Sequence, residues 1–155
     1  MTVTGRDSDT DWGHAMSTDD GLDILVTGGT GYIGSALVPI LRDADVVATV
    51  TVLDDFSASS PRNLLHAGLG GDDQIRFRQG DVTAYGDVES AVRGCDTVIH
   101  LAAITGADST HDRREETFRV NYGGTENVLR AAGKFDVDNV VFASSCNLYG
   151  RAATE

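Results

Sequence analysis

The chain has 155 residues, of which 41% are hydrophobic, and this length and composition predict one folded domain with a substantial core. Its formal net charge is −12 and its pI is about 4.5. A chain this acidic repels nucleic acid and anionic membranes, and it holds no apolar run near the roughly 18 residues of a membrane span, so we expect neither as a partner.

The predicted elements alternate along the chain. Residues 1–21 are polar and predict a disordered acidic tail, followed by one domain over residues 22–155. Short apolar or β-branched runs predict strands at 24–27, 46–53, 75–78, 97–101 and 140–143. Helical spacing of apolar residues predicts helices at 32–41, 61–67, 85–93 and 112–132, the last one ending at Gly133 as its C-cap. This order predicts an α/β fold, a Rossmann-type doubly wound parallel sheet, which looks incomplete because the chain stops just past the fifth strand.

The stretch "ILVTGGTGYIG", Ile24–Gly34, joins the first predicted strand to the first predicted helix. Glycines allow a tight turn and a close approach of backbone to a pyrophosphate, and the helix N-terminus offers free N–H groups. The spacing fits two motifs: Gly28, Gly31 and Gly34 form GxxGxxG, whereas Gly29, Gly31 and Gly34 form GxGxxG. Both motifs predict a dinucleotide site.

Carboxylates follow the next two predicted strands. Asp54 lies 20 residues after Gly34, where a carboxylate would bind the adenosine ribose and repel a 2′-phosphate, so NAD is favoured over NADP. In "GDV", which follows the third strand, Asp81 would accept a hydrogen bond from the adenine amino group and Val82 would pack on the ring. The alternative interpretations are solvated loop carboxylates and, for Asp81, the start of a turn.

Six stretches together resemble the extended short-chain dehydrogenase/reductase family, the NAD-dependent epimerase/dehydratase group: "VTGGTGYIG", "VLDDFS", "GDV", "VIHLAA", "VNYGGTENVLRAA" and "VVFASSCNLYG". The resemblance covers about residues 23–150. It implies the GxxGxxG spacing, with Tyr32 and Ile33 as backbone donors over the pyrophosphate and Gly29 without a role. It also implies that Leu101, Ala102 and Ala103 line the cofactor path and that Asn121 supports the active site. His100 is expected to be packed rather than catalytic.

The same resemblance identifies Ser145 as the catalytic hydroxyl. Dehydratases of the family carry an Asp-Glu pair directly after it, whereas this chain has Cys146 and Asn147, so an epimerase or dehydrogenase is favoured. The family's catalytic YxxxK motif is missing, because no tyrosine is followed four residues later by lysine. Without the lysine that lowers the pKa of the tyrosine, we predict that this chain alone is inactive or nearly so.

The resemblance therefore implies the NAD-binding part of a nucleotide-sugar epimerase or related sugar dehydrogenase, without its C-terminal substrate lobe. NAD is the expected cofactor, a nucleotide-sugar-type small molecule is the expected substrate of the intact parent, and a homodimer would form through the 112–132 helix. The alternatives are a non-catalytic NAD-binding regulatory module and a truncated gene relic.

The remaining sequence features concern the environment of the protein. No secretory signal is visible, and Cys95 and Cys146 have no metal-type spacing, so we expect reduced thiols in the cytoplasm and no metal site. Most of the acidic residues are Asp, 19 of 24, and Lys134 is the only lysine. This balance favours a halophile's protein over an ordinary acidic cytoplasmic enzyme, because high salt screens the self-repulsion.

Overall fold

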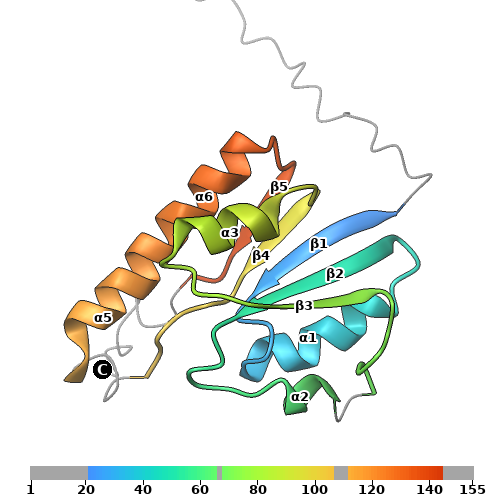
Figure 1. Cartoon of the computed structure of the whole chain (residues 1–155), viewed down its shortest axis with the longest axis horizontal. Helices are drawn as coiled ribbons and strands as arrows, with labels where there is room; N and C mark the ends of the chain where they lie inside the picture. The colour runs from blue at the N-terminus through green and yellow to red at the C-terminus, as the bar shows by residue number, and fades with distance from the viewer. Residues whose placement is uncertain (1–20, 66–67, 107–111, 145–155) are drawn as a thin grey trace, which may run out of the picture.

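A computed structural model describes residues 21–65, 68–106 and 112–144 of the chain. Five parallel strands form one sheet in the order β3-β2-β1-β4-β5 (Figure 1). The strands are β1 (Leu22–Thr27), β2 (Val47–Asp54), β3 (Ile75–Gln79), β4 (Thr97–His100) and β5 (Asn139–Phe142). The predicted Rossmann-type sheet and all five of its predicted strands are confirmed.

Helices cover both faces of this sheet (Figure 1). They are α1 (Tyr32–Arg42), α2 (Arg62–Leu65), α3 (Tyr85–Val92), α5 (Arg114–Phe118) and α6 (Thr125–Lys134), and the π-helical segment η1 (Arg119–Gly124) joins the last two. Alternation along β1 separates the two layers of the core. Val26 packs with Val38 of α1 and Leu64 of α2, whereas Leu25 packs with Val88 of α3 and with α6.

The predicted 112–132 helix differs from the observed one in three respects. It begins at Arg114, a π-helical segment interrupts it at residues 119–124, and it ends two residues later than predicted. Gly133 is not the C-cap but lies inside α6, and the left-handed residue is Asp136, with φ 52°. The N–H of Val137 donates to the carbonyl of Ala132 at 3.0 Å, as in a Schellman motif. Val137 packs against the core, so the helix ends where this apolar contact can form.

The chain order places a topological switch point beside β1. From β1 the chain moves outward through β2 to β3, then crosses back to β4 on the other side of β1. The carboxyl ends of β1, β2 and β4 meet at one edge, since Thr27 pairs with both Leu53 and His100. Ligands of open parallel sheets bind in the crevice outside the strands at such a point. In the part of the chain that the structure describes, no helix is long and apolar enough to cross a membrane.

Candidate functional site

The glycine turn after β1 is fixed by backbone contacts that exclude side chains. Gly28 has φ 68°, and a Cβ on it would lie 2.7 Å from the backbone nitrogen of Ala102. A Cβ on Gly34 would lie 2.5 Å from the Cα of Gly29, so only glycine lets α1 start so close to the turn. A Cβ on Gly31 would meet only the Gly28 carbonyl oxygen, at 3.2 Å. Among these three positions, Gly31 therefore leaves the most open space above the turn.

Gly29 has a steric role that the sequence interpretation missed. A Cβ on Gly29 would lie 2.8 Å from Cγ1 of Val52 in the neighbouring strand. The description of Gly29 as a glycine without a role in the motif leaves out this packing, because Val52 of β2 and Gly34 of α1 both lie against it. Gly28, Gly29 and Gly34 are therefore needed for the turn or for close packing, whereas Gly31 keeps the space above the turn open.

The start of α1 presents backbone donors to solvent. Gly31 is the N-cap and provides no side-chain hydrogen bond. Tyr32 is 97% exposed and Ile33 is 59% exposed, so neither side chain covers the end of the helix. The first N–H groups of a helix have no acceptor within it, and together with the helix dipole they favour an anion at this position. The predicted backbone donors thus lie where a phosphate can approach.

Asp54 ends β2 beside this turn and is only 8% exposed. Its Oδ2 accepts from the Thr30 N–H at 3.0 Å, and its Oδ1 accepts from the Phe56 N–H at 3.0 Å. The turn is further tied down by Asn63, whose Nδ2 donates to the Thr30 carbonyl at 2.9 Å, and by a 2.6 Å contact between the Thr30 and Ser59 hydroxyls. The carboxylate therefore joins the end of β2 to the glycine turn. Its remaining lone pairs can accept hydrogen bonds from a ligand.

The turn after β3 holds Asp81 and Val82. Asp81 Oδ1 accepts from the Thr83 N–H at 2.8 Å, so this carboxylate does begin a turn. The Val82 side chain is 5% exposed, and a Cβ on Gly124 would lie 2.7 Å from its Cγ2. Asn127, which sequence reasoning missed, donates from Nδ2 to the Val82 carbonyl at 3.0 Å and to that of Thr83 at 3.1 Å. Its position three residues after Gly124 on one helix face was the available signal.

The predicted cofactor path, Leu101–Ala103, continues from β4 over the glycine turn. The Ala102 N–H donates to the Thr27 hydroxyl at 3.3 Å. Asn121 holds the next residues through both atoms of its amide: Oδ1 accepts from the Ile104 N–H at 2.8 Å, and Nδ2 donates to the Ile104 carbonyl at 2.9 Å. Asn121 therefore supports this loop.

His100, at the end of β4, is 2% exposed, as expected for a packed residue. Its Nδ1 lies 2.6 Å from the Thr27 hydroxyl and its Nε2 lies 3.1 Å from the Thr125 hydroxyl. Burial lowers the pKa of the imidazole from 6.5 to about 4, because the charged form loses its hydration. His100 is therefore neutral at physiological pH.

The remaining residues singled out in the sequence are Ser145 and the two cysteines. Ser145 and Cys146 lie outside the described residues. Burial, with the nearby charges of Asp23 and Asp96, raises the pKa of the Cys95 thiol to about 11. Such a thiol is protonated at neutral pH and is a poor nucleophile.

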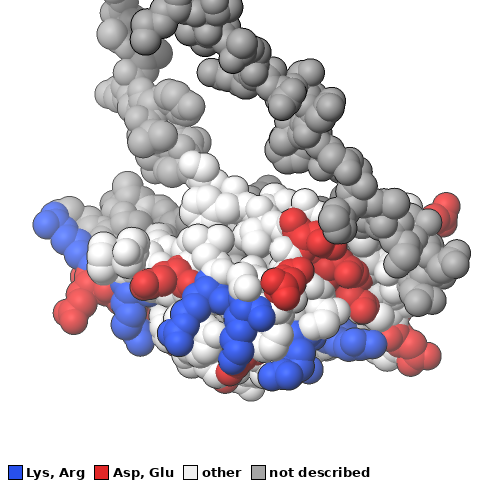
Figure 2. Space-filling view, turned by 90° about the horizontal axis from the view of Figure 1, so that it is seen from above, with Lys and Arg blue, Asp and Glu red and all other residues white. Residues whose placement is uncertain are grey.

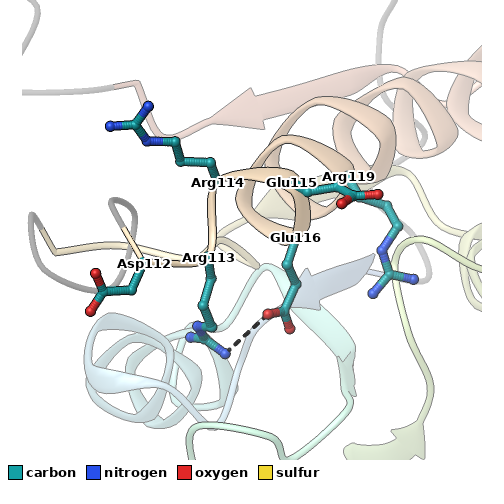
Figure 3. Close-up of a pocket in the computed structure, with 6 residues that line it drawn as sticks. All are labelled: Asp112, Arg113, Arg114, Glu115, Glu116 and Arg119. Carbon is teal, nitrogen blue, oxygen red and sulfur yellow. Dashed lines mark ion pairs between the residues drawn. The ribbon is translucent and has the colours of Figure 1, made fainter.

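The charged surface residues do not gather at the predicted cofactor site. Figure 2 shows Lys and Arg side chains interspersed with Asp and Glu along one border of the face it presents. A hollow of about 310 Å³ lies at the start of α5 and is lined by Asp112, Arg113, Arg114, Glu115, Glu116 and Arg119 (Figure 3). Arg113 pairs with Glu116 at 3.4 Å, and Arg114 points away from the other side chains. None of the predicted cofactor residues lines this hollow.

The strand order, the glycine turn and the carboxylate at the end of β2 define a dinucleotide-binding fold of the Rossmann type. Residues 24–155 match the model of the NAD dependent epimerase/dehydratase family. The chain belongs to this family.

Named relatives span a range of activities within that family. The chain is 36% identical over 137 residues to a 3 beta-hydroxysteroid dehydrogenase/Delta 5→4-isomerase of Mycobacterium tuberculosis, covering 86% of this chain and 34% of that protein. It is 36% identical over 129 residues to a UDP-glucose 4-epimerase of Pasteurella multocida, covering 82% and 38%.

Solved structures agree with this assignment. DesIV, a dTDP-glucose 4,6-dehydratase from Streptomyces venezuelae solved with NAD and TYD bound, superposes with a TM-score of 0.80 at 33% identity, covering 86% of this chain and 42% of that one. The chain thus spans about a third to two fifths of the length of the relatives that it matches.

Proposed function

We propose that this chain is the NAD-binding part of a nucleotide-sugar epimerase or a related sugar dehydrogenase. The observation that carries the proposal is the open N-terminus of α1 beside a fixed carboxylate, since Asp54 accepts from the Thr30 N–H of the same turn at 3.0 Å. A pyrophosphate suits the open N–H groups over Gly31, and ribose hydroxyls suit the remaining lone pairs of Asp54. Bound NAD would supply the hydride acceptor for oxidation of a sugar hydroxyl.

The residues around the turn fit such a group. The N–H groups of Tyr32 and Ile33 would bind the pyrophosphate, and Asp54 would bind the adenosine ribose. Asp81 and the backbone at Val82 would border the adenine, because the Val82 side chain itself is buried. The loop Leu101–Ala103, held by Thr27 at Ala102 and followed by Ile104, which Asn121 holds, would form the opposite wall. Ser145 would orient the reacting sugar hydroxyl.

Calorimetric titration of the full chain with NAD and with NADP tests the binding proposal. NAD is expected to bind more tightly than NADP, because the Asp54 carboxylate repels a 2′-phosphate. Asp54→Asn removes the charge and leaves one acceptor oxygen for the two N–H groups of Thr30 and Phe56, so NAD affinity should fall at least about tenfold and the preference over NADP should shrink. Asp55→Asn is the matched control, since that neighbouring carboxylate is exposed and, among the described residues, bonds to Ser57 alone. Absence of heat at millimolar NAD would rule out the proposal for this chain.

We also infer that the chain by itself does not turn over substrate, because its sequence has no YxxxK motif. Incubation with UDP-glucose and NAD, followed by chromatography, should give no epimer and no oxidised sugar. Turnover in the range of about 1–10³ s⁻¹ that is typical of enzymes would contradict this inference.

A homodimer through the long helix is part of the proposal. Phe118, Tyr122 and Leu129 are 66%, 59% and 54% exposed on α5, η1 and α6, and the first two rings stack at 5.0 Å. Exposed apolar side chains of this size favour an interface. In sedimentation experiments the wild-type chain should be a dimer and Tyr122→Glu a monomer, because the new charge would be buried in the interface. A wild-type chain that is monomeric at all concentrations would contradict the proposed dimer.

The negative net charge of the chain supports the proposal that the protein works in a high-salt cytoplasm. A net charge of −12 is self-repulsive at low ionic strength and is screened when the Debye length falls to about 3 Å near 1 M salt. Unfolding midpoints in urea should therefore rise steadily from 0.1 to 2 M KCl, whereas a flat profile would favour an ordinary acidic protein.

A further inference from the structure

A continuous polar chain crosses the otherwise apolar interior between β1, β4 and α6. It runs from the Ala102 N–H to the Thr27 hydroxyl at 3.3 Å, and from there to His100 Nδ1 at 2.6 Å. His100 Nε2 lies 3.1 Å from the Thr125 hydroxyl, which donates to the Asn121 carbonyl at 2.6 Å. Thr27 is fully buried and His100 is 2% exposed, so each of these groups depends on the others for its hydrogen bonds.

The direction of every bond in this chain follows from the number of hydrogens available. The Thr125 hydroxyl has one hydrogen and gives it to the Asn121 carbonyl, so it accepts from His100 and Nε2 carries the ring proton. The other ring nitrogen, Nδ1, then accepts from the Thr27 hydroxyl. The Thr27 oxygen in turn has a lone pair for the Ala102 N–H. One tautomer of His100 is therefore consistent with all four bonds of this chain at once.

The Thr125 end of this chain acts on the π-helical segment. Thr125 is the first residue of α6, and its hydroxyl bonds back to the carbonyl four residues earlier, that of Asn121 in η1. Side-chain bonds of this kind bend or widen helices because they compete with the backbone N–H for the carbonyl. A π turn costs regular hydrogen bonding and often occurs at functional sites. His100 supports the wide turn by orienting the hydroxyl that makes this bond.

The wide turn directs the Asn121 side chain at the loop after β4. Its amide forms a two-point bond with the backbone of Ile104, at 2.8 and 2.9 Å. The same loop is held two residues earlier, at Ala102, by the Thr27 end of the chain. Residues 102–104 are thus held at one end by Thr27 and at the other by Asn121. His100 connects these two supports, directly to Thr27 and through Thr125 to Asn121.

We propose that His100 is a positioning residue: through Thr27 and Thr125 it sets the backbone of residues 102–104, the wall that faces the glycine turn. The functional part of this statement rests on the proposed NAD site, whereas the structural part does not. A Cβ on Gly28 would lie within 2.8 Å of the Ala102 N and Cα, so any shift of this wall changes the space over the turn. His100 acts through other residues and does not itself contact a ligand.

A packed histidine without this role would behave differently. If His100 were only packed, breaking its hydrogen bonds would lower the stability of the whole domain. All strongly protected amides would then exchange faster together. A positioning residue acts locally, on the Ala102 and Ile104 amides, and leaves the β1–β2 pair unchanged. The comparison needs a variant that breaks the chain without creating a large cavity, and Thr125 offers one because valine has nearly the same shape.

Amide hydrogen exchange on the full chain, without cofactor, tests the structural part. In Thr125→Val the Ala102 and Ile104 amides should exchange at least about tenfold faster, while the Val50 and Val52 amides in β2 keep their rates. Thr125→Ser retains the hydroxyl and should restore slow exchange at both loop positions. A uniform change at all four amides, or no change at the loop, would overturn the proposal.

Two measurements extend the test. Nitrogen-15 spectra of the wild-type imidazole should show the Nε2–H tautomer at neutral pH, and the Nδ1–H tautomer would overturn the bond directions even if the valine variant fails to fold. NAD titration should show about a tenfold loss of affinity in Thr125→Val and recovery in Thr125→Ser. If the exchange results hold but neither wild type nor variant binds NAD, the proposed function fails and the positioning role stands.

Discussion

The two turns beside β1 at the carboxyl edge of the sheet are held in place by different physical means. In the turn after β1, hydrogen bonds that Thr30 forms with Asp54 and Asn63 add to close packing: a Cβ on Gly34 would come within 2.6 Å of two backbone carbons and a carbonyl oxygen. In the loop after β4, residues 101–104 carry ordinary side chains with no positive φ. This loop is held by hydrogen bonds from Thr27 and Asn121.

The difference determines what each turn can offer a ligand. Close packing fixes the glycine turn without using the N–H groups at the start of α1, so these remain available to an anion. Hydrogen bonding fixes the loop after β4 by using its Ala102 and Ile104 amides, so these two N–H groups serve to hold the wall rather than to bind a ligand. A dinucleotide site needs both, one surface that binds phosphate and one that limits the space beside it.

The largest expected effect is at Gly34. Gly34→Ala should destabilise the fold by about 3 kcal/mol, because the clashing atoms are backbone atoms of Gly28 and Gly29 that have no rotamer to change. Urea unfolding at neutral pH measures the loss. Gly133→Ala is the control: it lies inside α6 with open space around it and should gain up to about 1 kcal/mol. A loss below about 1 kcal/mol at Gly34 would mean that packing does not fix this turn.

Acidification should affect the second turn through His100. Its pKa is 6.5 when exposed and about 4 in the fold, so between these values the unfolded chain binds more protons and stability falls as pH falls. The free energy of unfolding attributable to this group should decrease by about 2 kcal/mol from pH 7.5 to 5.0. Urea titrations of wild type and His100→Asn should differ in their pH dependence by that amount. Parallel curves would show that His100 is not held in its neutral form.

The glycine turn could be predicted from the sequence because its causes are local. A short apolar run, glycines at fixed spacing and a helical pattern follow one another within Ile24–Leu41, and each restricts the next. The same holds for the five strands, whose apolar runs are bounded by turn residues. The role of Gly29 was missed because its contact, Val52, lies on another strand and no local pattern records that distance.

The contacts that support the second turn leave no local pattern because they join distant residues, and only the family resemblance pointed to Asn121. Thr27 and His100 are 73 positions apart, and Asn121 and Ile104 are 17 apart, so neither pair leaves a periodic signal. The end of α6 shows the same limit. Gly133 is a good local C-cap, but the contact of Val137 with the core moves the left-handed residue to Asp136.

A smaller effect is expected at Asn121. Asn121→Leu removes both bonds to Ile104, and because this loop is only partly buried the loss should be about 1–2 kcal/mol. Asn127→Leu is a matched control, since Asn127 also bonds to two backbone positions, at Val82 and Thr83. Both variants should lower the urea midpoint, but only Asn121→Leu should speed exchange of the Ile104 amide. Equal Ile104 rates in the two variants would show that Asn121 does not fix this loop.

The smallest expected effect is at Ser59, which bonds to the Thr30 hydroxyl at 2.6 Å and lies 3.5 Å from the nearer oxygen of Asp54. If packing and the Asp54 bond to the Thr30 N–H hold the glycine turn, Ser59→Ala should cost no more than about 0.5 kcal/mol and change NAD affinity less than twofold. Ser57→Ala, which removes an exposed hydroxyl bonded to Asp55, provides the baseline. A loss at Ser59 as large as that of Asn121→Leu would mean that both turns depend on side-chain hydrogen bonds. The glycines would then allow the shape of the turn after β1, but hydrogen bonds would hold it in place.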